Sequence, residues 1–141
     1  MRALGEIPIR VETSASLTPS TGTIGGGVRA ILSEIAARLE RLAAGGEPEA
    51  VDLRSMPMSP TDREQLWQAL GTGEVVITLQ VDGDSTIRET AVRGVWWNEF
   101  RDGRGELVAE FIEVAPVPGI LPVQVDEMRQ GANRLRARSA G

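Results

Sequence analysis

The chain has 141 residues, with 15 basic and 20 acidic side chains and a formal net charge of −5. It contains no His, Cys or Tyr, and every basic residue is Arg. These absences exclude a self-contained zinc, copper or iron–sulfur site, a Ser-His-Asp triad, a Cys-His pair, a Lys Schiff base and a disulfide. The acidic balance argues against nucleic-acid binding, and the apolar runs are too short to cross a bilayer. We therefore expect one cytoplasmic domain without metal or cofactor.

The first half of the chain begins with a polar segment and continues into a helix. Residues 1–20 are rich in Ser, Thr and Pro, and we expect them to form an N-terminal arm. From Val28 to Leu42, apolar residues recur at helical spacing, which predicts an amphipathic helix with one buried face. Gly45 and Gly46 are expected to end it, because glycine readily adopts the left-handed conformation that closes helices.

A short strand and a second helix are expected next. Residues 50–53 form an apolar run typical of a strand. Ser59 is a favourable N-cap, Pro60 suits the first helical position, and Asp62 lies where the acid of a capping box would be. The second helix should therefore begin after Ser59 and end at Gly71, with Leu66, Trp67 and Leu70 on its buried side.

From residue 74 the period changes to the alternation of apolar and polar residues that is typical of strands. Four strands are expected, at about 74–81, 86–92, 95–101 and 106–114. Short turns that contain glycine separate them, which favours an antiparallel meander. A last helix is expected from about Val125. The predicted class is α+β, with a four-stranded antiparallel meander over residues 74–114 packed with two to three helices.

Two adjacent tryptophans indicate which sheet face is buried. Neighbouring residues of a strand point to opposite faces, so Trp96 and Trp97 cannot enter the same core layer. If Arg101 lies opposite Glu106 across a four-residue loop, the first face contains Trp96, Phe100, Leu107, Ala109 and Phe111. We expect this face to form the structural core through Trp96, Phe100, Leu107 and Phe111. The second face contains Val95, Trp97, Glu99, Val108, Glu110 and Ile112. Because it mixes apolar residues with two acids, we expect it to be half-covered or exposed.

A tryptophan on such a face is typical of a protein–protein hot spot. The alternative is that a helix or the N-terminal arm covers Trp97. The candidate partner-binding patch consists of Trp97, Glu99, Glu110, Arg88, Met56 and Met58. Arg88 would offer its guanidinium to a carboxylate or a backbone carbonyl, although a cross-strand ion pair on a solvated face is the simpler interpretation. The two methionines would add adaptable apolar contact.

Two other kinds of site stay open at this stage. The Gly25–Gly27 run precedes a helix and, with Arg88, would allow a small-molecule or anion-binding domain. A P-loop needs a Lys that the chain lacks, and a flexible entry loop is the simpler interpretation of the glycines. A hydrolase that uses only carboxylates would need two acids facing one cleft. Glu99 and Glu110 share a face of the predicted hairpin, whereas Glu113 should point to the opposite face. Catalysis is the weaker hypothesis, since such acids are usually solvated.

The order of several short segments resembles the hydrogenase expression/formation proteins of the HupH/HyaF type. These segments are Thr21-Gly22, Ile31-Leu32-Ser33-Glu34-Ile35, Val51-Asp52-Leu53-Arg54, Met56-Pro57-Met58-Ser59-Pro60, Leu70-Gly71-Thr72-Gly73-Glu74-Val75, Ile87-Arg88-Glu89-Thr90, Gly94-Val95-Trp96 and Phe111-Ile112-Glu113-Val114. The likeness extends from about Thr21 to Pro118. It implies a single HupH-like domain over residues 21–141.

The resemblance also implies a function. Proteins of this type are accessory chaperones in the maturation of a bacterial nickel–iron uptake hydrogenase, and they act on the immature small subunit. We therefore expect a partner that is this subunit or another maturation protein, no enzymatic activity, and no nucleic acid or membrane insertion. Longer family members carry additional sequence, and a homodimer is one way for this chain to replace it.

Overall fold

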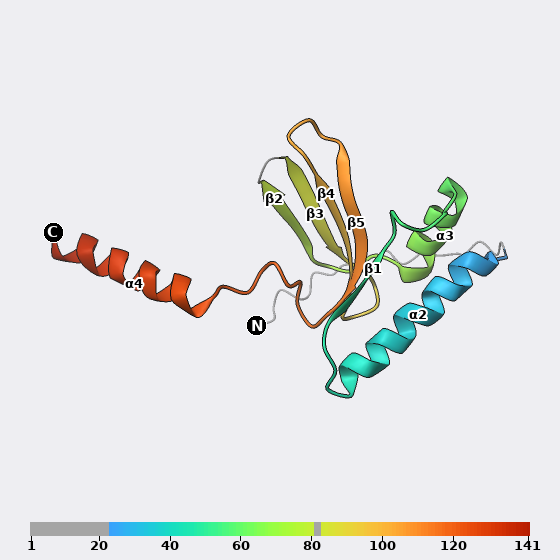
Figure 1. Ribbon diagram of the computed structural model, residues 1–141, viewed down its shortest axis with the longest axis horizontal. Coiled ribbons are helices and arrows are strands. Elements are labelled where there is room, and N and C mark those ends of the chain that lie inside the picture. Colours follow the sequence, from blue (N-terminus) through green and yellow to red (C-terminus); the bar gives the residue numbers. More distant parts are fainter. Residues whose placement is uncertain (1–22, 81–82) are drawn as a thin grey trace.

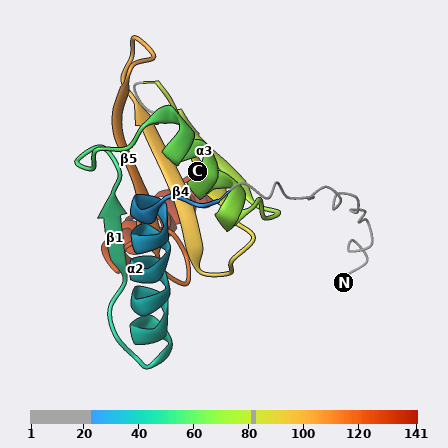
Figure 2. The same ribbon diagram turned by 90° about the vertical axis from the view of Figure 1, so that its right-hand side faces the viewer.

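The computed structural model describes residues 23–80 and 83–141, and the predicted arm at residues 1–20 lies outside them. Five antiparallel strands form one sheet in the order β1-β5-β4-β3-β2. The strands are β1 (Glu49–Asp52), β2 (Val76–Gln80), β3 (Asp84–Glu89), β4 (Val95–Arg101) and β5 (Leu107–Val114). The helices are α2 (Gly26–Ala43), α3 (Pro60–Leu70) and α4 (Val125–Ala140). Helices α2 and α3 lie on one side of the sheet, whereas α4 projects from the opposite side (Figures 1 and 2).

The α+β class and the antiparallel meander of four consecutive strands are confirmed. Strand β2 pairs with β3, β3 with β4, and β4 with β5. The sheet has one strand more than the predicted four, because β1 pairs with β5 at the edge. The residues of β1 were expected to form a strand, but its position beside β5 depends on contacts between segments distant in sequence.

The start of α3 follows the predicted capping pattern. The Asp62 backbone N–H donates to the Ser59 hydroxyl oxygen at 3.0 Å, and the Ser59 N–H donates to the Asp62 carboxylate at 3.1 Å. Pro60 occupies the first turn, where a missing N–H costs no hydrogen bond. The helix ends at Gly71, whose φ of +75° is a conformation that side chains disfavour. These local interactions fix where α3 begins and ends.

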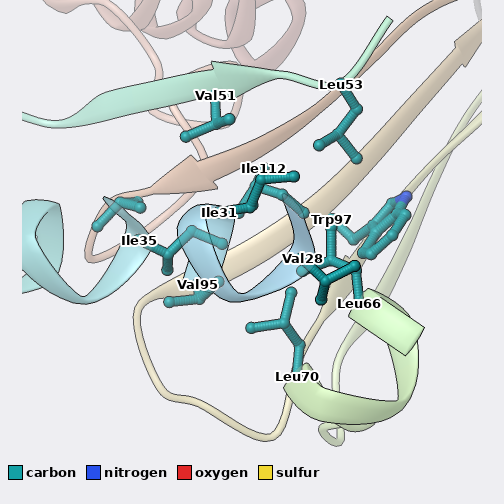
Figure 3. Close-up of a cluster of buried hydrophobic side chains, with 11 residues drawn as sticks. Val28, Ile31, Ile35, Val51, Leu53, Leu66, Leu70, Val95, Trp97 and Ile112 are labelled. Carbon is teal, nitrogen blue, oxygen red and sulfur yellow. The ribbon is translucent and has the colours of Figure 1, made fainter. Parts of the chain in front are cut away.

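The main core lies between the sheet and the two helices α2 and α3 (Figure 3). The helices contribute Val28, Ile31, Ile35, Leu66 and Leu70, and the sheet side contributes Val51, Leu53, Val95, Trp97, Ile112 and Val114. The core is therefore on the face that contains Trp97, and the expectation that the face of Trp96 forms the core is wrong. Alternation along a strand separates the two faces, but it does not show which face the helices cover.

The division of side chains between the two faces is nevertheless as predicted. Trp97 lies opposite Ile112 and Trp96 opposite Glu113 in the β4–β5 register. The pairing near the turn differs from the expectation, because Arg101 lies opposite Leu107 and an irregularity interrupts the ladder beside it. The register is shifted only where the hairpin closes, so the face assignments upstream are unaffected.

The far face of the sheet is partly buried. Trp96 is buried there, and its indole N–H donates to the Ala115 carbonyl at 3.0 Å, so the segment after β5 contacts it. Phe100 and Phe111 stack with ring centroids 5.6 Å apart. Both phenylalanines, like Leu107, are only partly buried. Of the four predicted core residues, Trp96 alone is buried, and it lies outside the main core cluster.

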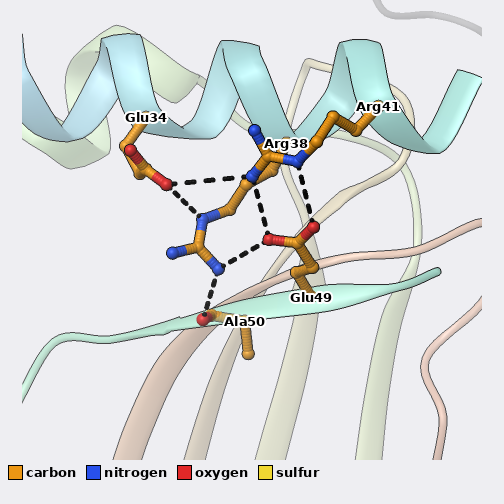
Figure 4. A network of polar contacts seen from close by, with 5 residues as sticks. All are labelled: Glu34, Arg38, Arg41, Glu49 and Ala50. Carbon is orange, nitrogen blue, oxygen red and sulfur yellow. Dashed lines mark hydrogen bonds and ion pairs between the residues drawn. The ribbon is translucent and has the colours of Figure 1, made fainter. Parts of the chain in front are cut away.

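A charged network joins α2 to β1 (Figure 4). The Arg41 guanidinium donates to both Glu49 carboxylate oxygens, at 3.0 and 3.2 Å. Arg38 pairs with Glu34 at 2.8 Å and donates to the Ala50 carbonyl at 3.0 Å. The hydrogen bond from Arg41 lowers the pKa of Glu49 and raises the pKa of Arg41. The network fixes the edge strand against the helix and occupies a backbone acceptor of that edge.

Candidate functional site

A groove of about 590 Å³ lies between α3 and the strands β3 and β4. We call it the α3 groove. Its lining residues are Met58, Pro60, Arg63, Glu64, Trp67, Arg88, Trp97 and Glu99. Four of the six predicted partner-binding residues, Met58, Arg88, Trp97 and Glu99, line this one groove. The structure therefore brings together residues that the sequence places up to 41 positions apart.

Three elements position the lining residues. Arg63 and Trp67 are four residues apart on α3, so both point from the same side of the helix. Arg88 and Trp97 lie directly opposite each other in the β3–β4 ladder. Because partners in an antiparallel ladder point to the same face, the Arg88 side chain lies beside the Trp97 ring on the helix-covered side.

Trp97 forms the floor of the groove. Its side chain is only 3% exposed, so the expectation of a half-covered or exposed tryptophan is wrong. The covering residue is Trp67, which packs edge-to-face on it with ring centroids 5.1 Å apart. This outcome corresponds to the alternative that a helix covers Trp97. Trp67 is partly exposed, and it supplies the aromatic surface that we expected from Trp97.

A buried carboxylate lies below the floor. Glu110 is 3% exposed, and its Oε2 atom accepts a hydrogen bond from the Trp97 indole N–H at 2.8 Å. The Arg63 guanidinium pairs with the same carboxylate, lies 3.9 Å from Glu99 and sits 5.9 Å above the Trp97 ring. A buried charge needs such partners, because an unpaired carboxylate loses its hydration without compensation. Glu110 is thus a structural partner of Arg63 and Trp97, not a lining residue.

Arg88 is the cation of the groove that remains available. Its side chain is exposed, and among the described residues it forms no hydrogen bond or ion pair. A free guanidinium presents several donors in a plane that matches a carboxylate or a backbone carbonyl. The surface continues beyond Arg88 to its cross-strand neighbour Val76, which is 52% exposed at the sheet edge. One exposed apolar side chain of the edge strand therefore lies beside Arg88.

The two methionines of the predicted patch lie in different surroundings. Met58 lines the groove, whereas Met56 packs against the main core and is absent from the lining. Three lining residues were not predicted from the sequence as part of a site: Arg63, Glu64 and Trp67. The available signal was their spacing, since Arg63 and Trp67 share a face of a helix that the sequence predicts well.

The predicted anion site receives no support from the geometry. The Gly25 N–H donates to the Gln65 side-chain oxygen at 3.1 Å, so this backbone donor is occupied. A Cβ built at Gly25 would lie 3.7 Å from the Asp62 carboxylate, which repels an anion. Arg88 lines the α3 groove, and none of the three glycines Gly25–Gly27 does.

The acids that were considered for catalysis are also placed by the structure. Glu99 and Glu110 lie opposite each other across β4 and β5, and Glu113 lies on the other face, as predicted. Arg63 contacts both Glu99 and Glu110, and Glu113 accepts from the Asn98 amide at 2.9 Å. Glu99 and Glu110 therefore belong to an ion-pair network, and Glu113 to a separate hydrogen bond.

Two further findings concern the described residues. No helix within residues 23–80 and 83–141 is long and apolar enough to cross a membrane. Over the same part of the chain, the carboxylates form no group of three or more that is suited to holding a metal ion.

The chain matches the model of the HupH hydrogenase expression protein, C-terminal conserved region, over residues 27–140. It belongs to the HupH family. It is 35% identical to the hydrogenase expression/formation protein HoxQ of Azotobacter vinelandii over 92 residues, which cover 65% of this chain and 32% of that protein. It is 29% identical to the hydrogenase expression/formation protein HupH of Rhizobium leguminosarum bv. viciae over 109 residues, covering 77% of this chain and 39% of that protein. The chain spans about a third of the length of these curated relatives.

The solved structures include the hydrogenase expression protein HupH from Thiobacillus denitrificans ATCC 25259. It is 38% identical to this chain, the match covers 82% of this chain and 97% of that chain, and the TM-score is 0.76. The HupH family model includes every residue that lines the α3 groove, and it extends to residue 140, so that it includes α4 to its last residue.

Proposed function

We propose that this HupH-family protein is a cytoplasmic accessory chaperone in the maturation of a nickel–iron uptake hydrogenase. In this proposal it holds the immature small subunit in the α3 groove and carries no metal itself. Family membership supports the hydrogenase context, because the relatives are named as hydrogenase expression/formation proteins. The observation that carries the choice of surface is the α3 groove, where the Arg88 guanidinium, unpaired within the part of the chain that the structure describes, lies beside aromatic and thioether side chains.

The chemistry of the groove suits a polypeptide client. Met58 and Trp67 provide adaptable and rigid apolar contact, which suits the apolar side chains of an incompletely folded protein. Arg88 provides a directional donor for a client carboxylate or backbone carbonyl. Aromatic, Met and Arg side chains are the types enriched at protein–protein interfaces. A groove of this composition binds a segment of chain through shape and a few polar contacts.

The groove does not offer the groups that catalysis needs. The chain has no His, Cys or Lys, and the two acids nearest to one another are held by Arg63. A carboxylate pair that is already neutralised by a guanidinium is poorly suited to general acid–base chemistry. A binding role requires no such group, which supports an accessory function instead of an enzymatic one.

The proposal is tested by binding of purified protein to an isolated immature small subunit. Wild-type protein is expected to capture the subunit, and Arg88→Glu is expected to weaken the affinity at least about tenfold, which corresponds to about 1.4 kcal/mol. The charge reversal removes the free donor and places a carboxylate against the client carboxylate or carbonyl. Arg104→Glu is the matched control, because Arg104 is an exposed arginine of the β4–β5 turn outside the groove lining.

Two results would contradict the proposal. If wild-type protein captures neither the immature small subunit nor another hydrogenase component from hydrogenase-expressing cells, the function is wrong. If capture occurs but Arg88→Glu and Arg104→Glu bind equally well, the α3 groove is not the client site.

A further inference from the structure

Helix α4 presents an apolar stripe that packs against nothing among the described residues. None of the 16 residues of α4 is buried, and the helix projects from the sheet into solvent (Figure 1). Val125, Met128 and Leu135 are 56%, 54% and 65% exposed. With Ala132, they recur at spacings of three and four residues, which places them on one face of the helix. Such a face is typical of a helix that docks onto another surface.

The charge of α4 indicates what kind of surface it fits. The helix carries four arginines and two acids, whereas the rest of the chain carries 11 arginines and 18 acids. At 100° per residue, Arg129 and Arg136 flank one side of the apolar stripe and Arg138 lies on the other side. Pairing two parallel α4 helices along their stripes would bring these arginines together, and like charges repel. The stripe therefore fits an apolar surface with acidic borders.

The α3 groove provides such a surface along part of its lining, which combines apolar side chains with two acids and with the basic residues Arg63 and Arg88. Its apolar surface comes from Met58 and Trp67, and Glu64 and Glu99 are its acidic lining residues. The arginines of α4 match Glu64, which forms no ion pair among the described residues, whereas Glu99 already pairs with Arg63 and Arg101. The first turn of α4 contains Asp126 and Glu127, which match Arg88 in charge.

The arrangement of the fold favours a groove on another molecule. Helices α3 and α4 lie on opposite sides of the sheet (Figure 1), and the α3 groove is lined by residues of α3 and of the strands that it covers. Only residues 115–124 connect β5 to α4. A reciprocal exchange between two copies buries both stripes and closes the assembly with twofold symmetry.

We propose that α4 binds in the α3 groove of a second copy, which gives a homodimer whose two grooves are both occupied until a client displaces the helices. This inference rests on the proposed function in one respect, because it takes the α3 groove to be the docking surface for clients. It assigns that site a regulator, the α4 helix of the partner copy. The dimer keeps the apolar stripes and the grooves out of water when no client is present.

The test uses the purified full chain without any hydrogenase component. Light scattering coupled to gel filtration is expected to show a concentration-dependent dimer with twice the monomer mass of 15.1 kDa. The double variant Met128→Glu/Leu135→Glu is expected to be monomeric, because it places two carboxylates in the stripe. The control Gln130→Glu/Asn133→Glu adds the same charge to the opposite face of α4 and is expected to remain dimeric. Circular dichroism checks that the variants stay folded.

Cross-linking locates the contact. The chain has no cysteine, so introduced thiols are the only ones present. A mixture of Met128→Cys protein and Glu64→Cys protein, treated with a short bismaleimide, is expected to give a cross-linked heterodimer. The mixture of Gln130→Cys protein and Glu64→Cys protein is expected to give at least about fivefold less, because residue 130 lies on the far side of α4 from the stripe.

The proposal is overturned if the full chain is monomeric at every concentration, or if the dimer persists in Met128→Glu/Leu135→Glu. It is also overturned if Met128→Cys and Glu64→Cys proteins give no more cross-linked heterodimer than the control mixture. A monomeric wild-type protein that still captures the small subunit through Arg88 would reject the dimer and leave the client proposal intact. A dimer with these properties that captures no hydrogenase component would reject the client proposal and leave the dimer intact.

Discussion

The indole N–H of Trp97 donates a 2.8 Å hydrogen bond to Oε2 of Glu110, and both groups are buried beneath the α3 groove. The bond runs diagonally across the β4–β5 pair, since Trp97 lies opposite Ile112 and Glu110 lies opposite Glu99. It explains how a carboxylate is accommodated on the core face of the sheet. The tryptophan and Arg63 together replace the water that Glu110 loses on folding.

We expect Trp97→Phe to destabilise the protein by about 1–3 kcal/mol, because the ring is retained while the buried Glu110 loses a donor. Trp97→Ala should cost about 3–5 kcal/mol, since it also leaves a cavity in the core. Urea denaturation measures both losses. Trp67→Phe is the matched control, because its indole N–H forms no hydrogen bond among the described residues and the loss should be smaller. Equal losses for the two Trp→Phe variants would reject the role assigned to the Trp97–Glu110 bond.

We expect Arg63→Met to lower the free energy of unfolding at pH 7 by about 1–3 kcal/mol, because Glu110 then stays buried without its cation. Adding Glu110→Gln should recover part of this loss, since the neutral amide needs no cation, and a double-mutant cycle measures the coupling. Arg104 is an exposed turn arginine whose side chain forms no hydrogen bond or ion pair among the described residues, so Arg104→Met should change stability by less than about 0.5 kcal/mol. Additive effects of Arg63→Met and Glu110→Gln would contradict the pairing.

The network between α2 and β1 predicts a pH dependence. The hydrogen bond from Arg41 lowers the pKa of Glu49 below its ordinary value of 4.5, so the folded state favours the ionised carboxylate. The resulting stabilisation is present above pH 4.5 and is lost as the pH falls through the lowered pKa. Wild-type protein should therefore be more stable than Glu49→Gln at pH 7, and the difference should shrink below pH 4.5.

Thermal denaturation of both proteins between pH 3 and 7 checks this prediction. Glu47→Gln serves as the control, because Glu47 is exposed and forms no ion pair among the described residues. A difference between wild type and Glu49→Gln that stays constant down to pH 3 would reject the assigned role of the Arg41–Glu49 pair.

Metal content provides a further test of the chaperone proposal. The purified protein should contain iron, nickel and zinc at well below one equivalent by mass spectrometry, because it has no thiolate or imidazole ligand. Added metal should be removed by gel filtration. Stoichiometric binding of any of the three would mean that the protein supplies metal as well as contact.

The helices and strands could be predicted from the sequence because they depend on residues close together along the chain. The capping residues of α3 bond to one another within four positions, and the alternation from β2 to β5 reflects a geometry in which successive side chains point to opposite faces. The positions of Trp96 and Trp97 on opposite faces followed from the same rule and are confirmed.

Which face of the sheet forms the core could not be predicted in this way. Glu99 and Glu110 made the face of Trp97 look exposed, but Arg63 arrives from α3, 47 residues before Glu110, and compensates the buried charge. The packing of Trp67 on Trp97 likewise depends on how α3 crosses the sheet. Neither contact has a local signal.

The sequence by itself determined which chemistry this protein lacks, where its helices and strands lie, and which family it resembles, because composition, spacing and residue order are properties of the chain alone. Only the tertiary structure decided which sheet face α2 and α3 cover, that Trp97 is the floor of a groove, that Arg88 has no partner among the described residues, and that α4 stands apart from the core. These features depend on contacts between segments far apart in the sequence, and their energies are set by burial, which no single segment can specify.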